Sequence, residues 1–91
     1  MEGTQMRIEY DDEVDAIYVH VREGIPVARS EILEDGRVVD LDVDGHLIGI
    51  EILEASSHGV RLADLADRFG LHEGRPGLEA LERLFRSTEP A

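Results

Sequence analysis

Apolar and polar residues alternate most regularly between Arg37 and Leu53, on both sides of the dipeptide Asp44-Gly45. Asp-Gly accepts the positive φ that both central positions of a type I′ turn require, so the pattern predicts a β-hairpin with Asp44 and Gly45 as its turn. In this register Leu41 faces Ile48. One face of the hairpin is then expected to be apolar, formed by Val39, Leu41, Val43, Ile48, Ile50 and Ile52.

Shorter alternating segments precede this hairpin. Residues 16–22 are apolar on both faces, which favours a central strand or one at an interface, and Gly24 and Pro26 end it. Residues 27–33 carry Arg29, Ser30 and Glu31 in the middle, which favours an edge strand. The sequence therefore predicts an antiparallel β-meander of about five short strands, at residues 6–10, 16–22, 27–33, 37–43 and 46–53.

After Ser57 the apolar period changes from two residues to about 3.6, as expected for helices. One helix is predicted over 60–69, with Gly70 as its C-terminal cap and Leu71 folding back onto it. A second is predicted over 76–86, with Pro76 in its first turn. We expect an α+β protein with an acidic sheet domain at 1–57 and a helical extension at 58–91, which packs on the sheet or on a partner subunit.

Charge separates the same two parts. The chain has 9 basic residues, all of them Arg, against 21 acidic ones, for a net charge of −12. Residues 1–57 contribute 4 − 15 = −11 and residues 58–91 contribute 5 − 6 = −1. Such a surface repels nucleic acid. Its charge is explained by solubility, with a docking surface for a basic partner as the alternative.

The helical part also resembles a DNA-binding motif. Residues 62–71 resemble the first helix and turn of a helix-turn-helix. The reading helix would then have to pass through residues 72–77, where Gly74, Pro76 and Gly77 interrupt it. An ordinary amphipathic helix with a glycine cap accounts better for the pattern.

The cellular location and the oligomeric state can also be predicted from the sequence. The chain has no Cys, its start is polar, and no apolar run approaches the roughly 18 residues of a membrane span. We therefore expect a cytoplasmic protein with no membrane association. A thin core and a sheet with two apolar faces also predict a homodimer. Its expected interface residues are Ile17, Val19, Val21, Leu78, Leu81 and Phe85.

Two separated motifs resemble a known family. The stretch Tyr10-Asp-Asp-Glu-Val-Asp-Ala-Ile-Tyr-Val19 is followed by Val38-Val-Asp-Leu-Asp-Val-Asp-Gly-His-Leu-Ile-Gly-Ile-Glu-Ile-Leu53 and by Ala55-Ser56. Together they are similar to the small prokaryotic family named domain of unknown function 2283, over about residues 6–56. Asp12 departs from the family, which often has Pro there, and this changes the stiffness of the turn. The resemblance implies a compact β-rich domain with no established activity.

The hairpin also contains a calcium-binding pattern. Asp40, Asp42, Asp44, Gly45 and Glu51 match an EF-hand loop, with Glu51 as the bidentate ligand. An EF-hand lies between two helices, whereas β-branched and alternating apolar residues flank this loop. We therefore expect the carboxylates to line a solvated hairpin face, with metal binding by Asp40, Asp42, Asp44 and Glu51 as the alternative.

Catalytic chemistry has little support in the sequence. The chain lacks Cys and Lys, and His20, His46, His58 and His72 show no local metal-site spacing. We expect no catalytic residues and no cofactor. The preferred hypothesis is a non-enzymatic protein-binding or regulatory module, of which an antitoxin-like neutraliser of a basic protein is one form. The alternative is a divalent-metal-binding domain or a metal-dependent enzyme.

Overall fold

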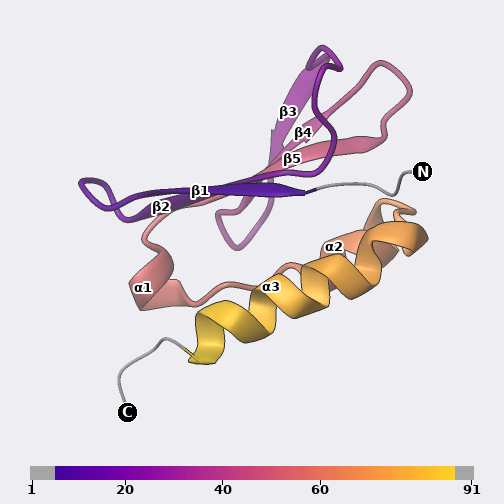
Figure 1. The fold of residues 1–91 in the computed structure, drawn as a ribbon. Coiled ribbons are helices and arrows are strands. Elements are labelled where there is room, and N and C mark those ends of the chain that lie inside the picture. Colours follow the sequence, from indigo (N-terminus) through magenta and orange to yellow (C-terminus); the bar gives the residue numbers. More distant parts are fainter. Residues whose placement is uncertain (1–5, 88–91) are drawn as a thin grey trace.

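The computed structural model describes residues 6–87, and the side chains of these residues except 58 and 85–87. A single five-stranded antiparallel sheet is followed by helices, which confirms the α+β prediction (Figure 1). The strands are β1 (Arg7–Asp11), β2 (Ala16–His20), β3 (Arg29–Ile32), β4 (Val38–Leu41) and β5 (Leu47–Ile52). The helices are α1 (Ala55–His58), α2 (Ala63–Arg68), the 3-10 helix η1 (His72–Gly74) and α3 (Arg75–Ser87).

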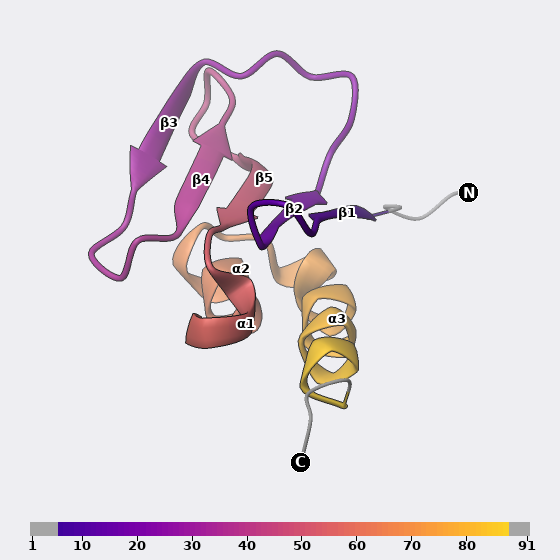
Figure 2. The same cartoon turned by 90° about the vertical axis from the view of Figure 1, so that its left-hand side faces the viewer.

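The strand order is β1-β2-β5-β4-β3, which differs from a simple meander at one connection. The chain leaves β2 and passes through residues 21–28 to the far border of the sheet, as Figure 2 shows. This places β2 beside the apolar β5 and leaves the polar β3 at the edge, a Greek-key arrangement of the last four strands. The central position of β2 and the edge position of β3 agree with the sequence pattern.

The turn between β4 and β5 differs from the expected type I′ geometry. The amide of Gly45 donates to the carbonyl of Asp42, and the amide of Asp42 donates to the carbonyl of His46. Only Gly45 has a positive φ, of 84°, so the loop is a type I turn followed by a left-handed glycine. The predicted pairing of Leu41 with Ile48 is therefore wrong, and Leu41 lies opposite Leu47.

This shift creates an irregularity that changes which residues enter the core. Val39 still pairs with Ile50, but the register shifts between Asp40 and Leu41. Leu47, which is 1% exposed, joins the core cluster, and Val43 at the tip of the turn is 83% exposed. Ile48 lines a pocket with Tyr18 on the opposite face of the sheet. The extra residue of a bulge has this effect because it reverses the alternation of faces along one strand.

The helices cover one face of the sheet within the same chain (Figure 1). The core contains sheet residues such as Val19 and Ile50 together with Leu62, Leu65 and Leu78 from the helical part. Most of the residues expected at a dimer interface are covered in this arrangement. The side chains of Ile17, Val19, Val21 and Leu78 are at most 2% exposed in one chain, Leu81 packs against the core, and the side chain of Phe85 lies outside the described residues.

The end of α2 has the predicted glycine cap. Gly70 has a φ of 71°, and the amide of Leu71 donates to the carbonyl of Ala66 at 2.7 Å. The start of α2 is later than predicted, at Ala63. There the carboxylate of Glu82, from α3, accepts the amides of Leu62 and Ala63 at 2.8 and 3.0 Å. A side chain 20 residues away thus caps this helix, which has no cap residue of its own.

Candidate functional site

Asp15, in the turn between β1 and β2, connects that hairpin to the start of α1. Its carboxylate accepts the amide of Ser56 at 3.1 Å and the hydroxyl of Ser56 at 2.6 Å. The hydroxyl of Tyr10 donates to the same carboxylate, and the amide of Ala55 donates to the Asp15 carbonyl. The bond from Ser56 lowers the pKa of Asp15. One acidic side chain therefore holds two segments that are 41 residues apart in sequence.

The backbone at this junction adopts a rare conformation. Asp15 has a φ of 56° and Glu54 has a φ of 52°, and they are the two non-glycine residues with positive φ among those the structure describes. A left-handed residue with a β-carbon costs on the order of 1 kcal/mol, somewhat less for Asp. Strained backbone conformations cluster at active sites, ligand clamps and switch regions, so this junction is a candidate site.

The turn presents acidic and apolar side chains side by side. We call Tyr10, Asp11, Asp12, Glu13, Val14, Leu53 and Glu54 the acidic turn surface. Tyr10, Val14 and Leu53 are 55%, 61% and 48% exposed. Among the described residues, no Arg or His forms an ion pair with Asp11, Asp12 or Glu13. The acidic turn surface therefore combines three carboxylates that no described Arg or His neutralises, Asp11, Asp12 and Glu13, with exposed apolar area.

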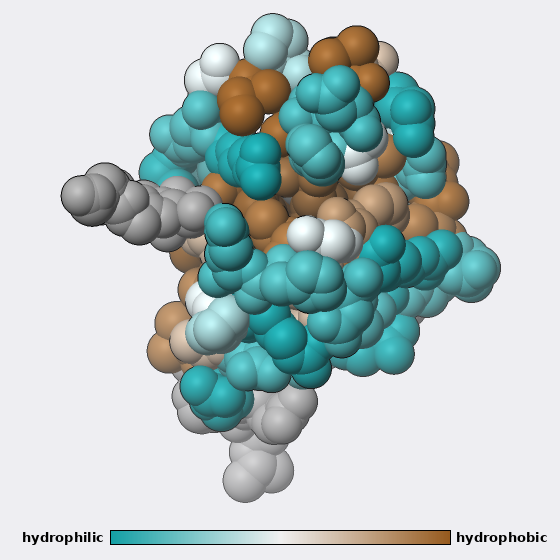
Figure 3. Space-filling model, turned by 90° about the vertical axis from the view of Figure 1, so that its right-hand side faces the viewer, coloured by the Kyte–Doolittle hydropathy of each residue, from teal (hydrophilic) through white to brown (hydrophobic). Residues whose placement is uncertain are grey.

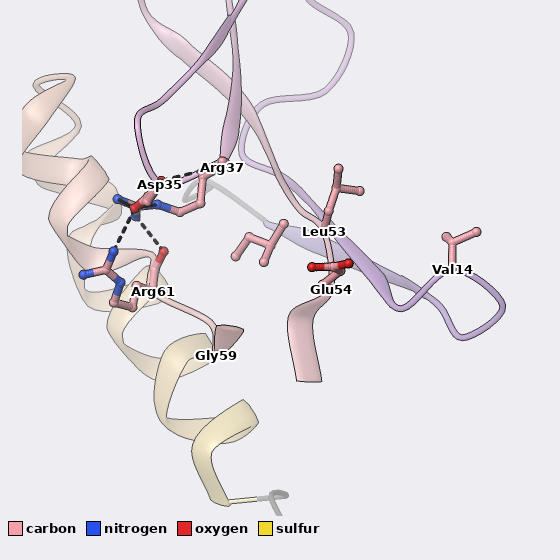
Figure 4. A pocket seen from close by; sticks show the side chains of 9 residues that line it. Val14, Asp35, Arg37, Leu53, Glu54, Gly59 and Arg61 are labelled. Atoms are coloured by element: carbon pink, nitrogen blue, oxygen red, sulfur yellow. Dashed lines mark hydrogen bonds and ion pairs between the residues drawn. The ribbon is translucent and has the colours of Figure 1, made fainter. Parts of the chain in front are cut away.

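An open pocket of about 630 Å³ adjoins the acidic turn surface (Figure 4). Val14, Leu53 and Glu54 lie on one side of it, and Asp35, Arg37 and Arg61 lie on the other. Val14 also lines a smaller pocket, together with Tyr10 and Glu51. The two hollows therefore meet at Val14.

The far wall of the larger pocket is a network around Arg37. The guanidinium donates to both carboxylate oxygens of Asp64, at 2.8 and 2.9 Å, and to Asp35 at 2.8 Å. It also donates to the carbonyl of Arg61, and Arg37 is only 8% exposed. The same interactions lower the pKa of Asp35 to about 2, mainly through its bond from Arg37. Arg37 therefore joins the turn after β3 to α2 and has a structural role.

A second network lies on the sheet face away from the helices. The hydroxyl of Tyr18 on β2 donates to Asp40 on β4 at 2.5 Å, and Ser30 on β3 donates to the other carboxylate oxygen at 2.5 Å. Burial and the bond to Asp40 raise the pKa of Tyr18. Gly49 lies on β5, between β2 and β4, and a β-carbon there would lie 1.9 Å from the Tyr18 hydroxyl oxygen. Asp40 therefore serves as a hydrogen-bond acceptor inside the sheet.

The four carboxylates of the predicted EF-hand pattern lie in two places. Asp40 and Glu51 are in strands and are paired with Gly49 and Val38. Asp42 and Asp44 lie in the turn, where their carboxylates and the ring of His46 approach within 4.8 Å of one another. Asp42 accepts the amides of Asp44 and His46 there, and the bond from His46 lowers its pKa. The pattern thus reflects a strand and a turn, and the turn alone groups possible cation ligands.

The histidines lie apart from one another. His20 contacts Glu9 at 3.1 Å and packs edge-on against Tyr18, His46 lies beside Asp42, and His72 is in η1. The side chain of His58 is outside the described set. The single cluster of potential metal ligands among the described residues contains one histidine.

Apolar side chains also reach the surface elsewhere. Figure 3 shows them around a hollow in the upper part of the face opposite to that of Figure 2. A pocket of about 330 Å³ is lined by Ile25, Val27 and Ile48, together with Arg7 and His20. Arg7 and His20 are both held by Glu9, so this pocket has less uncompensated charge than the acidic turn surface.

Sequence reasoning missed the roles of Asp15, Arg37 and Glu82. The two family-like motifs could have indicated the role of Asp15, because Asp15 lies in the first motif and its partner Ser56 ends the second. Asp64 and Glu82 lie outside both motifs, and nothing local marked their partners.

Comparison with known proteins identified one similarity. A family model described as a protein of unknown function, DUF2283, matches residues 7–56, more than half of the 91 residues. The matched segment covers the whole sheet and ends at Ser56. It contains the network around Asp40, and it contains the network around Arg37 apart from Asp64 and Arg61. No curated protein and no solved structure matches the chain. The resemblance noted from the two motifs is thereby confirmed.

Proposed function

The chain belongs to the DUF2283 family of proteins of unknown function, and we propose that it is a protein-binding module whose acidic turn surface docks a basic partner. The observation that carries this proposal is the combination of Asp11, Asp12 and Glu13, which pair with no described Arg or His, and exposed apolar side chains around one strained junction. Asp15 and Glu54 have positive φ at that junction, and the bonds between Asp15 and Ser56 join its two segments.

The charge distribution supports this choice of surface. Elsewhere, many carboxylates neutralise an arginine of the same chain: Glu31 pairs with Arg29, Glu34 with Arg68, and Asp67 with Arg75. Asp11, Asp12 and Glu13 have no such partner among the described residues. Three adjacent acids without counter-charges attract a cationic surface, accelerate its association and orient it.

Exposed apolar side chains on the same surface can supply the binding energy that charge alone does not. The side chains of Tyr10, Val14 and Leu53 rise beside the acids and border the two pockets that meet at Val14. Interfaces take most of their binding energy from a few such anchors, with charged groups at the rim. We therefore expect a partner segment with both arginine or lysine and large apolar residues, as in the antitoxin-like role of covering a basic protein.

Metal binding is the second candidate, and one observation favours it. Asp42, Asp44 and His46 bring three potential ligands together in the turn between β4 and β5. The wider set with Asp40 and Glu51 loses support, because the Asp40 carboxylate is bonded to Tyr18 and Ser30. The remaining site is small and at the surface, so we rank it below protein binding.

The test is affinity purification from cells with the wild-type chain and two matched triple variants. Asp11→Lys, Asp12→Lys, Glu13→Lys reverses the acidic turn surface. Glu34→Lys, Asp44→Lys, Glu73→Lys makes the same change in net charge at exposed sites elsewhere. We expect a basic protein to copurify with the wild type and the second variant and to be lost with the first. Equal loss with both variants would show that only net charge matters and would contradict a docking site.

A further inference from the structure

The outer side of β3 is a free sheet edge. β3 pairs with β4 alone, and Figure 2 shows it at one border of the sheet with no helix or strand along its outer side. The other edge strand, β1, also pairs with a single strand, β2. An unprotected edge is a template for pairing with another strand.

The hydrogen-bond pattern fixes which backbone groups of β3 point outward. The amide of Leu33 donates to the carbonyl of Arg37, which closes the β3–β4 hairpin. Bonded and non-bonded pairs alternate along an antiparallel ladder, so Glu31 also bonds to β4, and at the start of β3 the amide of Ala28 donates to the carbonyl of Leu41. The amides and carbonyls of Ser30 and Ile32 therefore face away from the sheet.

The side chains of β3 are arranged for pairing with an identical strand. Arg29 and Glu31 lie on the same face of the strand, two residues apart, and are bonded to each other at 3.0 Å with both side chains substantially exposed. On the other face Ile32 is 79% exposed. An antiparallel copy centred on Ser30 would place Arg29 opposite Glu31 twice.

We propose that β3 is the interface with a second copy of this chain, paired antiparallel with Ser30 opposite Ser30. Neighbouring registers that also use the outward groups are centred on Arg29 or on Glu31, and each would place like charges opposite each other. The Ser30-centred register is the one among these three with complementary charges. It joins two sheets into one, closes the β3 edge of each copy, and brings Ile32 against the backbone and Ala28 of the second copy.

This interface is independent of the proposed partner-binding function. It uses β3 at one border of the sheet, whereas the acidic turn surface lies at the β1–β2 end. It also uses other residues than the interface expected from the sequence, of which Ile17, Val19, Val21 and Leu78 are in the core.

The test is light scattering over a wide range of protein concentration at physiological ionic strength. We expect the wild type to reach twice the chain mass, and the single variants Arg29→Glu and Glu31→Arg to remain monomers because each opposes like charges. The double variant with both changes should dimerise again, and an equimolar mixture of the two single variants should form a heterodimer. Both single variants keep a strongly negative net charge, so general attraction does not explain pairing in the mixture.

Hydrogen exchange provides the second measurement and controls for folding. The amides of Ser30 and Ile32 should be protected in the dimer and exchange rapidly in the single variants. The amide of Glu31, or of the residue that replaces it, should stay protected throughout because it bonds to β4. A wild type that remains monomeric, or a Glu31→Arg variant that dimerises as well as the wild type, would overturn the proposal.

Discussion

The hydroxyl of Tyr18 lies 2.5 Å from a carboxylate oxygen of Asp40, although another strand, β5, separates their two strands. The ring reaches across β5 at the position of Gly49, where no side chain blocks it. A glycine in a strand interior weakens a sheet unless something else uses the space. Here the space is used by the Tyr18 ring, whose hydrogen bond to Asp40 joins β2 to β4 across β5.

Gly49→Ala should therefore destabilise the protein by about 1–3 kcal/mol, because the new methyl group overlaps the Tyr18 ring and displaces it from Asp40. Tyr18→Phe is the matched comparison. It removes the hydroxyl and leaves the strand backbone intact, so it should cost about 1 kcal/mol. Urea unfolding measures both changes, and a Gly49→Ala protein as stable as the wild type would show that the close approach has no structural importance.

Removing the guanidinium of Arg37 should lower the free energy of unfolding more than the changes at Gly49 and Tyr18 do. Arg37→Ala leaves Asp35 and Asp64 near each other without their shared counter-charge, and we expect a loss of about 2–4 kcal/mol. Arg68→Ala is the control, since Arg68 forms an exposed pair with Glu34 that contributes about 0–1 kcal/mol. Similar destabilisation by both substitutions in thermal or urea unfolding would contradict a central role for Arg37.

The network around Arg37 also predicts a dependence of stability on pH. The pKa of Asp35 is lowered from 3.8 to about 2 on folding, so its ionised form stabilises the native state above pH 3.8. That contribution should disappear as the pH falls through about 2. The difference in unfolding free energy between wild type and Asp35→Asn should be largest near neutral pH and shrink in acid. A difference that is constant with pH would refute this assignment.

Calcium should leave the fold unchanged. Glu51, the bidentate ligand of the EF-hand pattern, is in a strand, and Asp42 already accepts two backbone amides in its turn. Titration of metal-free protein with millimolar calcium should therefore change neither the circular dichroism nor the melting temperature appreciably. Micromolar binding that is lost in Asp42→Asn would instead establish the turn as a metal site.

Local patterns predicted the parts of the fold that depend on neighbouring residues. The Gly70 cap needed only Leu71 and the preceding helical stripe, and the edge position of β3 followed from Arg29 and Glu31. The irregularity in β5 was not predictable, because Leu47 and Ile48 are both apolar and fit either face. The expected I′ turn also failed for a local reason, since Asp-Gly fits both turn types.

Long-range interactions account for most of what the sequence did not reveal about the site. The acidic residues 11–15 were visible as charge, but their position beside Leu53 depends on the bonds between Asp15 and Ser56. Arg37 and Asp64 are 27 residues apart, and no periodicity relates them. Ile17, Val19, Val21 and Leu78, which were expected at a dimer interface, lie in the core because the helices fold back over the sheet and cover its apolar face.

The most direct test of the acidic turn surface is the dissociation constant of the copurified basic partner, measured by calorimetry. The Asp11→Lys, Asp12→Lys, Glu13→Lys variant should bind at least about tenfold more weakly than the wild type, a loss of about 1.4 kcal/mol. The dissociation constant of the Glu34→Lys, Asp44→Lys, Glu73→Lys variant should stay within about threefold of the wild-type value, since charges away from the contact contribute little to the binding energy. Equal affinities of the wild type and the first variant would contradict docking at this surface.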